Sequence, residues 1–157
     1  MPVKYSKWIT REQLSQDRDT LYVFGDNLER RGYGGQAKEM RGEPNAIGVA
    51  TKHKPTMDEN AFFTDEDIMT VIRDMKEVEA RFYNGGYHSI CIPSDGIGTG
   101  LSELHTRAPL VYEYINQILY SFWPKRFGIY PTAENLARVE NYKPSQELKD
   151  LLERRHR

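Results

Sequence analysis

Short β-prone runs alternate with helix-forming segments along this chain, and that alternation limits the folds open to it. Residues 20–24, 46–50 and 88–93 are short apolar runs, and Gly25 is expected to stop the first of them. Strands that alternate with helices pair in parallel, because each helix carries the chain back to the start of the next strand. The sequence therefore predicts a three-layer αβα fold of the α/β class, with a mostly parallel central sheet and helices on both faces.

The clearest helix begins at Thr64, which can cap it, and the acids of residues 65–67 suit the positive end of its dipole. Its apolar residues keep one face: Ile68, Val71, Ile72, Met75, Val78 and Phe82. An Asn-Gly-Gly sequence at 84–86 ends it. Two shorter helices are expected earlier, near residues 10–17 and 36–41.

Three more elements are expected toward the C-terminus. Ser102 is a candidate cap for a helix with a long apolar stripe, which Pro124 is expected to close. A short strand near 127–130 would lie at the edge of the sheet. An amphipathic helix is expected over 145–156.

Length and charge restrict the class of protein. A chain of 157 residues suits one domain with a sizeable core, which we expect over about 20–130, before the C-terminal helix. The formal net charge of −1 gives no general attraction to nucleic acid or anionic membranes. It leaves room only for local basic clusters such as residues 30–31 and 154–157.

Cysteine and histidine usage argues against disulfide, thiol and metal chemistry. Cys91 is the only cysteine, and its apolar surroundings predict a small buried side chain. The histidines are scattered and lack cysteine partners, so no metal site is expected. No apolar run has the length of a signal peptide core or a membrane span. We expect a cytoplasmic monomer without membrane contact, metal or cofactor.

Two glycine-rich loops are the candidate binding elements, because each follows a strand and leads into a helix. Glycine lets backbone approach a ligand closely, and exposed N–H groups at a helix start can hold an anion. Two such loops at neighbouring strand ends suit a diphosphate. Neither matches a Walker A or a dinucleotide fingerprint. The candidate residues of the first loop are Gly25, Asp26, Asn27, Gly32, Tyr33, Gly34, Gly35 and Gln36. Those of the second are Ser94, Asp95, Gly96, Ile97, Gly98, Thr99, Gly100 and Leu101.

Lys52 is the candidate catalytic residue. It follows the second strand run, where a restrained amine would meet a ligand at the same edge of the sheet. A desolvated lysine can act as a nucleophile toward the C1 carbon of a sugar. The alternative is a solvated lysine in a basic loop, and the sequence leaves both open.

Together these segments resemble the macrodomain superfamily of ADP-ribose-binding α/β modules. Asn27-Leu28 followed by 32–37 looks like the family's asparagine and glycine-rich segment, which wraps the distal ribose. Residues 92–101 look like its diphosphate-binding loop. The segment 51–56 is similar to the branch that removes ADP-ribose from protein carboxylates or DNA bases, and the resemblance makes Lys52 its catalytic lysine.

The chain departs from that branch at two points. The branch usually has an aspartate directly after the second loop, where this chain has Ser102 followed by Glu103, a candidate substitute. The first loop also lacks the usual apolar strand and small-residue run before its asparagine, because residues 25–27 follow the strand run directly. In many macrodomains a Gly-Asp pair in an earlier loop holds the adenine amino group. Asp26 is a candidate for that role or for a place in the ribose loop.

The resemblance implies two functions that the sequence does not separate. One is an ADP-ribosyl glycohydrolase acting on modified protein or DNA through Lys52. The other is a non-catalytic reader or sequestering protein for ADP-ribose or a related nucleotide signal. An unrelated RNA-binding or protein-binding module is a further alternative, for which Tyr5, Trp8 and Tyr33 are the available aromatic residues.

Overall fold

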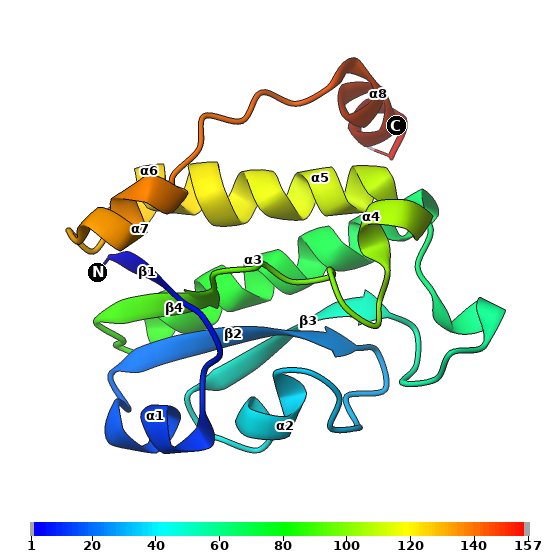
Figure 1. Ribbon diagram of the computed structural model, residues 1–157. Helices are drawn as coiled ribbons and strands as arrows, with labels where there is room; N and C mark the ends of the chain where they lie inside the picture. Colours follow the sequence, from blue (N-terminus) through cyan, green and yellow to red (C-terminus); the bar gives the residue numbers. More distant parts are fainter. Residues whose placement is uncertain (1, 156–157) are drawn as a thin grey trace.

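A computed structural model describes residues 2–155, and a four-stranded parallel sheet lies at its centre (Figure 1). The strand order is β1-β4-β2-β3, and each neighbouring pair is parallel. The strands are β1 (Val3–Ser6), β2 (Thr20–Asn27), β3 (Ala46–Lys52) and β4 (Ser89–Pro93). The predicted α/β class and the parallel sheet are confirmed.

Helices cover both faces of this sheet, as the three-layer prediction requires. Figure 1 shows α1 (Arg11–Gln16) and α2 (Ala37–Met40) on one face and α3 (Ile68–Asn84) and α5 (Pro109–Gln117) on the other. The remaining helical pieces are η1 (Glu59–Ala61), η2 (Asp65–Asp67), α4 (Leu104–Arg107), the π-turn η3 (Ile118–Phe122), α6 (Trp123–Phe127), α7 (Ala133–Arg138) and α8 (Gln146–Arg155). The helix α8 lies outside α5, away from the sheet (Figure 1).

The hydrophobic core is split by the sheet. The larger cluster joins α3, α5 and α8 to side chains such as Val23 and Ile92 on one face. The smaller cluster joins α1 and α2 to the other face through Leu14, Met40 and Cys91. Cys91 is buried, and burial raises the pKa of its thiol to about 12, which suits a packing role.

The start of α3 follows the capping chemistry predicted for Thr64. Its side chain and that of Asp67 form a capping box around the 3₁₀ turn Asp65–Asp67, after which α3 begins at Ile68. The predicted apolar face is buried in the larger cluster. Gly85 caps the far end, so the predicted stop is also confirmed.

Two strands are longer than the sequence indicates, and the expected stop at Gly25 is wrong. The strand β2 continues through Gly25, which pairs with Val49, and ends at Asn27 opposite Lys52. Glycine weakens a strand but does not end it when the neighbouring strand supplies the ladder. The longer strands place two candidate site residues next to each other, because Asn27 ends β2 and Lys52 ends the adjacent strand β3.

The long helix expected between Ser102 and Pro124 is divided. Ser102 does not cap it; Glu103 is the residue before α4, with a left-handed φ of 50°. A break at Ala108 separates α4 from α5. Pro124 does not close the helix either, because it lies in the first turn of α6, where proline is tolerated.

Three elements, η1 among them, have no counterpart in the sequence-based prediction, and a fourth was overestimated. The strand β1 and the helix α7 were not predicted, and β1 lies outside the expected core range of about 20–130. The expected edge strand near 127–130 is reduced to a single bridge between Ile129 and Val3 of β1. His156 and Arg157, part of the expected basic tail, lie outside the described residues.

Within residues 2–155, no helix combines the length and the apolar character needed to cross a membrane.

Candidate functional site

A cavity of about 490 Å³ lies beyond the carboxyl ends of the strands. Volumes of this size are typical of small-molecule sites. Its walls are strand ends and the segments that follow them: Lys7 and Trp8 after β1; Gly25, Asp26, Asn27, residues 31–37 and Arg41 after β2; Thr51, Lys52, Pro55 and Met57 after β3; and Pro93 with residues 95–102 after β4.

The cavity lies where the strand order reverses. After β2 the chain moves outward to β3, then returns past β2 to form β4 on its other side. The loops that follow β2 and β4 therefore diverge and leave a crevice between them, which is where ligands bind in open α/β sheets.

Most of the predicted site residues line this cavity, and Ser94 is the exception. Its amide donates to the Ser6 carbonyl at 2.7 Å, and its own carbonyl accepts from the Tyr120 hydroxyl at 3.1 Å and from Arg138. Ser94 therefore anchors the second loop from behind. Both glycine-rich loops and Lys52 are otherwise brought together as predicted.

Some cavity residues were not chosen from the sequence. Lys7 and Trp8 follow β1, and the alternation of apolar Val3 and Tyr5 with polar residues was the available signal for that strand, although not for its place in the sheet. Arg41 lies directly after α2 and gave no sequence signal. The others not selected are Arg31, Ala37, Thr51, Pro55, Met57, Pro93 and Ser102.

The second glycine-rich loop, residues 94–102, offers a row of unpaired backbone donors. The amides of residues 97–102 donate no hydrogen bond to any described residue, and all six residues line the cavity. Consecutive free N–H groups form a concave donor surface for anions. The loop is nevertheless held in place, because the amide of Leu104 donates to the Gly98 carbonyl at 3.0 Å.

The first glycine-rich loop, residues 25–36, offers a second row. The amides of residues 31–37 likewise donate to no other residue of the described chain, and these residues line the same cavity. The two loops meet at Gly25, where an added Cβ would lie 3.5 Å from Ile97 Cβ and 3.8 Å from the amide nitrogen of Gly98.

Gly98 has a structural role as well as a place in the cavity. Its φ is +87°, and a Cβ there would lie 2.4 Å from Leu104 Cδ1. A bulky residue at Gly98 would therefore disturb the fold as well as the cavity, because Leu104 is fully buried and cannot move aside freely.

Residues 4–118 match the model of DUF7831, a protein family of unknown function. This chain belongs to the DUF7831 family. The match reaches all four strands and includes every residue that lines the cavity. Comparisons with curated proteins and with solved structures each found no match.

Asn27 of this DUF7831 domain is the last residue of β2 and lines the cavity, with 7% of its surface exposed. Its Nδ2 donates to the Arg31 carbonyl at 2.8 Å, whereas its buried Oδ1 has no partner among the described residues. A buried acceptor without a partner costs about 1–3 kcal/mol. A donor from a ligand, such as a ribose hydroxyl, would remove that cost.

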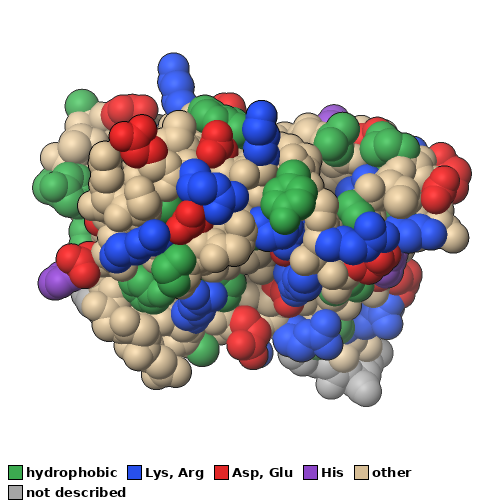
Figure 2. Space-filling model, turned by 90° about the horizontal axis from the view of Figure 1, so that it is seen from below, with side chains coloured by type: hydrophobic (Ala, Val, Ile, Leu, Met, Phe, Trp, Pro, Cys, Tyr) green, Lys and Arg blue, Asp and Glu red, His purple; other side chains and the backbone are tan. Residues whose placement is uncertain are grey.

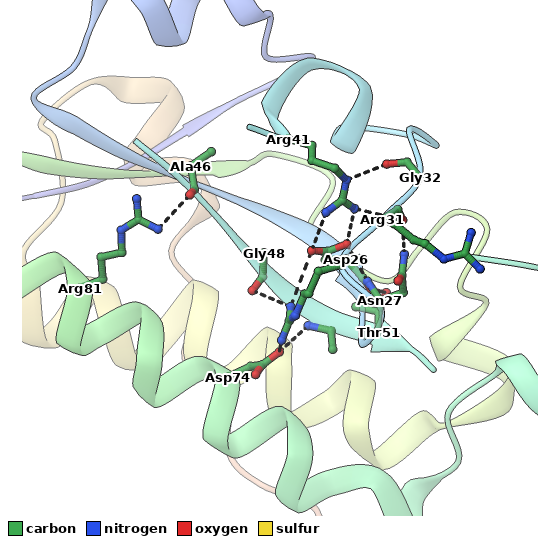
Figure 3. A network of polar contacts seen from close by, with 12 residues as sticks. Asp26, Asn27, Arg31, Gly32, Arg41, Ala46, Gly48, Thr51, Asp74 and Arg81 are labelled. Carbon is green, nitrogen blue, oxygen red and sulfur yellow. Dashed lines mark hydrogen bonds and ion pairs between the residues drawn. The ribbon is translucent and has the colours of Figure 1, made fainter. Parts of the chain in front are cut away.

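Asp26 does not offer its carboxylate to a ligand. Arg41 contacts both carboxylate oxygens, the Asn27 amide donates to Oδ1 at 2.8 Å, and Arg30 lies 3.7 Å from Oδ2 (Figure 3). An adenine amino group would have to displace these partners. Asp26 therefore organises the loop, and the adenine role considered for it is not available in this arrangement.

Lys52 ends β3 and is 7% exposed. Its Nζ donates to the Thr56 carbonyl at 2.5 Å and lies 4.6 Å from the centre of the Phe62 ring. Burial lowers the pKa of Lys52, the Glu103 carboxylate opposes this, and the Arg107 guanidinium adds to the lowering. This direction is the one that a nucleophilic amine requires.

Glu103, the candidate substitute for the missing aspartate, does not line the cavity, although Ser102 does. The carboxylate of Glu103 accepts from Arg107 Nε at 3.0 Å, and Arg107 also binds Glu59 and stacks 3.6 Å from the Phe62 ring centre. Glu103 therefore acts on Lys52 through its charge and not as a base inside the cavity.

Large apolar side chains surround the mouth. Trp8, Tyr33, Met57 and Leu101 are 54%, 68%, 56% and 60% exposed, and they come from the segments after the four different strands. Exposed aromatic rings at a polar cavity are suited to stacking on a planar base.

The molecular face that carries α1 and α2 mixes both charges (Figure 2). Lys and Arg side chains lie across it with Asp and Glu among them, and Arg11 and Arg18 share Glu43 at 2.9 and 2.7 Å. An RNA-binding module needs a continuous basic surface. This face does not favour that alternative.

Proposed function

We propose that this protein is a macrodomain-like module that binds ADP-ribose in the cavity at the carboxyl edge of its sheet. The observation that carries the proposal is the pair of unpaired amide rows, residues 31–37 and 97–102, in the lining of one cavity. The row at residues 97–102 suits the oxygen acceptors of a diphosphate, and the row at residues 31–37 suits the hydroxyl oxygens of the distal ribose.

The rest of the cavity supports the same ligand. Asn27 supplies an acceptor for a ribose hydroxyl, and Trp8 and Tyr33 supply aromatic faces for a base. Two acidic residues line the cavity, and the charge of Asp26 is neutralised by Arg41, so Asp95 is the remaining acid. Three further lining residues, at positions 7, 31 and 52, are basic. The charge at the cavity therefore favours an anionic nucleotide.

A second candidate function, hydrolysis of ADP-ribose from modified protein or DNA, rests on Lys52. The free amine would attack C1 of the distal ribose, the bond from C1 to the target would break, and water would then displace the lysine. The lowered pKa and the burial of Lys52 favour this function. Without it, the protein is a reader or sequestering protein.

Binding is tested by titrating the folded protein with ADP-ribose, ADP, AMP, ATP and NAD. We expect ADP-ribose to bind with a Kd in the micromolar range, about −8 kcal/mol, and to raise Tm through its preference for the native state. If millimolar ADP-ribose gives neither calorimetric heat nor a rise in Tm, the proposed function is wrong.

A further inference from the structure

We propose that Arg41, held by Asp26, is a specificity-determining residue that positions the first glycine-rich loop and lets the site distinguish ADP-ribose from ADP. This inference rests on the proposed function. It concerns a residue that the sequence did not select and whose contacts are with the protein itself.

Arg41 fastens the loop through its backbone carbonyls. Its Nε donates to the Gly32 carbonyl at 2.7 Å, and one Nη donates to the Arg31 carbonyl at 3.3 Å (Figure 3). The same guanidinium binds both oxygens of Asp26. A planar fork of donors can hold these acceptors in one geometry, which a lysine ammonium cannot reproduce.

The anchor for this fork is buried. The Asp26 side chain is 3% exposed, and Arg41 is 15% exposed. Arg30 lies on the other side of Asp26 and forms an ion pair with Asp74 of α3 at 2.7 Å. Asp74 in turn accepts a hydrogen bond from the Ala50 amide at 2.8 Å. A chain of alternating charges therefore links the loop to β2, β3 and α3 (Figure 3). Buried charges without such partners are costly, so the network has one strongly preferred arrangement.

The network ends at Asn27. The Arg31 carbonyl that Arg41 holds is also the acceptor for Asn27 Nδ2, at 2.8 Å. That contact fixes which end of the amide is the donor, and it leaves Oδ1 as the acceptor without a partner among the described residues. Arg41 therefore sets both the orientation of Asn27 and the position of the free amides that follow Arg31.

In the proposed function, the loop that Arg41 holds meets the distal ribose through the free acceptor of Asn27, whereas the free amides of the second loop hold the diphosphate. ADP lacks the distal ribose but keeps the diphosphate and adenosine. A defect confined to the first loop should therefore weaken ADP-ribose and spare ADP, and a general loss of structure would weaken both.

The test is a calorimetric titration of wild type and Arg41→Lys with ADP-ribose and with ADP. We expect the Kd for ADP-ribose to rise about tenfold or more, which corresponds to about 1.4 kcal/mol or more, and the Kd for ADP to stay within about twofold. Asp26→Asn, which removes the anchor of the same guanidinium, should give the same selective loss.

Arg81→Lys is the matched control. Arg81 also holds two backbone carbonyls, those of Ala46 and Pro44, but at the opposite end of β3 from the cavity. The Arg81→Lys variant should have a lower Tm, because it loses contacts to backbone carbonyls as Arg41→Lys does, and the Kd of both ligands should be unchanged.

Three results would overturn the inference. Equal weakening of ADP and ADP-ribose in Arg41→Lys would mean that Arg41 touches the diphosphate or that the fold is damaged. Unchanged affinity for both ligands in a folded Arg41→Lys or Asp26→Asn would mean that the loop does not depend on the network. A selective loss in Arg81→Lys would show that the effect is not local. Failure of wild type to bind either ligand would instead refute the proposed function.

Discussion

At the scale of single residues, Arg30 and Glu103 hold left-handed backbone angles, with φ of 53° and 50°. Arg30 lies in the first glycine-rich loop, and Glu103 directly follows the second. Such angles cost a non-glycine residue about 1–2 kcal/mol. Each is held by an ion pair, Arg30 with Asp74 and Glu103 with Arg107. Strain at the two loops that form one cavity is typical of a site whose geometry is fixed for a ligand.

Gly25 and Gly128 offer variants with opposite expected effects. An alanine methyl at Gly25 meets no atom closer than 3.5 Å but lies 3.8 Å from the Gly98 amide, between the two loops. We expect Gly25→Ala to keep Tm within about 2 °C, since alanine costs a strand no more than glycine, and to weaken ADP-ribose at least about tenfold. Calorimetry and thermal melts measure the two quantities.

Gly128→Ala is the control for that variant. Gly128 has a φ of +85°, lies outside the cavity, and has no described atom near its added Cβ. It should lose about 1 kcal/mol of stability and keep full affinity. Normal binding by Gly25→Ala would show that the phosphates lie elsewhere.

Lys52 decides between hydrolase and reader. If Lys52 is the nucleophile, Lys52→Ala should abolish release of ADP-ribose from modified protein or DNA and keep most of the affinity for free ADP-ribose. The attack needs the neutral amine, so turnover should rise with pH. Because burial lowers the pKa of Lys52, the plateau should come below about 10.4, the ordinary lysine value.

The contrary result is equally clear. If wild type and Lys52→Ala bind ADP-ribose alike and neither releases it from any modified substrate, the protein is a reader. If turnover by an active enzyme did not change with pH below about 10.4, the chemistry would be assigned to another group.

At the scale of elements, α3 shows how local chemistry and packing share the work. Its capping box at Thr64 satisfies amides at the start, and its buried stripe joins the larger core. The helix carries no cavity residue, yet its Asp74 holds the Ala50 amide and Arg30. The element therefore supports the site from behind the sheet.

The cap can be tested apart from the site. Thr64→Ala should lower the free energy of unfolding by about 1 kcal/mol, because the hydroxyl that accepts from the Glu66 amide is lost. Thr70→Ala, the same change inside α3, should be neutral or slightly stabilising because alanine is the better helix former. Urea titrations measure both. Equal losses at the two positions would mean that the cap contributes nothing.

At the scale of the whole molecule, α8 belongs to the same core as the sheet, although it lies outside the residues matched by the family model. Leu148 and Leu151 are buried, and α8 packs on the outer side of α5 (Figure 1). The amide and hydroxyl of Ser145 both donate to Glu113 of α5, which fixes the approach of α8. We therefore expect α8 to unfold with the rest of the chain.

Leu151→Ala tests this cooperativity. Truncation of a fully buried leucine should cost about 2–5 kcal/mol and leave a single unfolding transition with an unchanged dependence on urea. Leu136→Ala, at an exposed position of α7, should change stability by less than about 0.5 kcal/mol. An early, separate loss of helical signal in Leu151→Ala would show instead that α8 is an independent appendage.

Local patterns in the sequence are sufficient to predict the class of fold and the placement of the glycine-rich loops. Both depend on short-range patterns: the apolar runs of β2, β3 and β4, the periodicity of α3, and the glycine-rich segments that follow β2 and β4. Parallel strands end at one edge of a sheet, so loops that follow them must lie near one another. The same reasoning predicts the position of Lys52 beside the loops, because Lys52 comes at the end of a strand run.

The roles of the polar side chains at that edge depend instead on tertiary contacts. Asp26 is a positioning residue because Arg41 and Arg30 reach it, and Glu103 lies outside the cavity because Arg107 holds it. Trp8 joins the mouth because β1 pairs with β4, a contact between residues far apart in the chain. Partners of this kind are fixed by the closing of the sheet and not by local spacing, so no sequence pattern near Asp26, Glu103 or Trp8 records them.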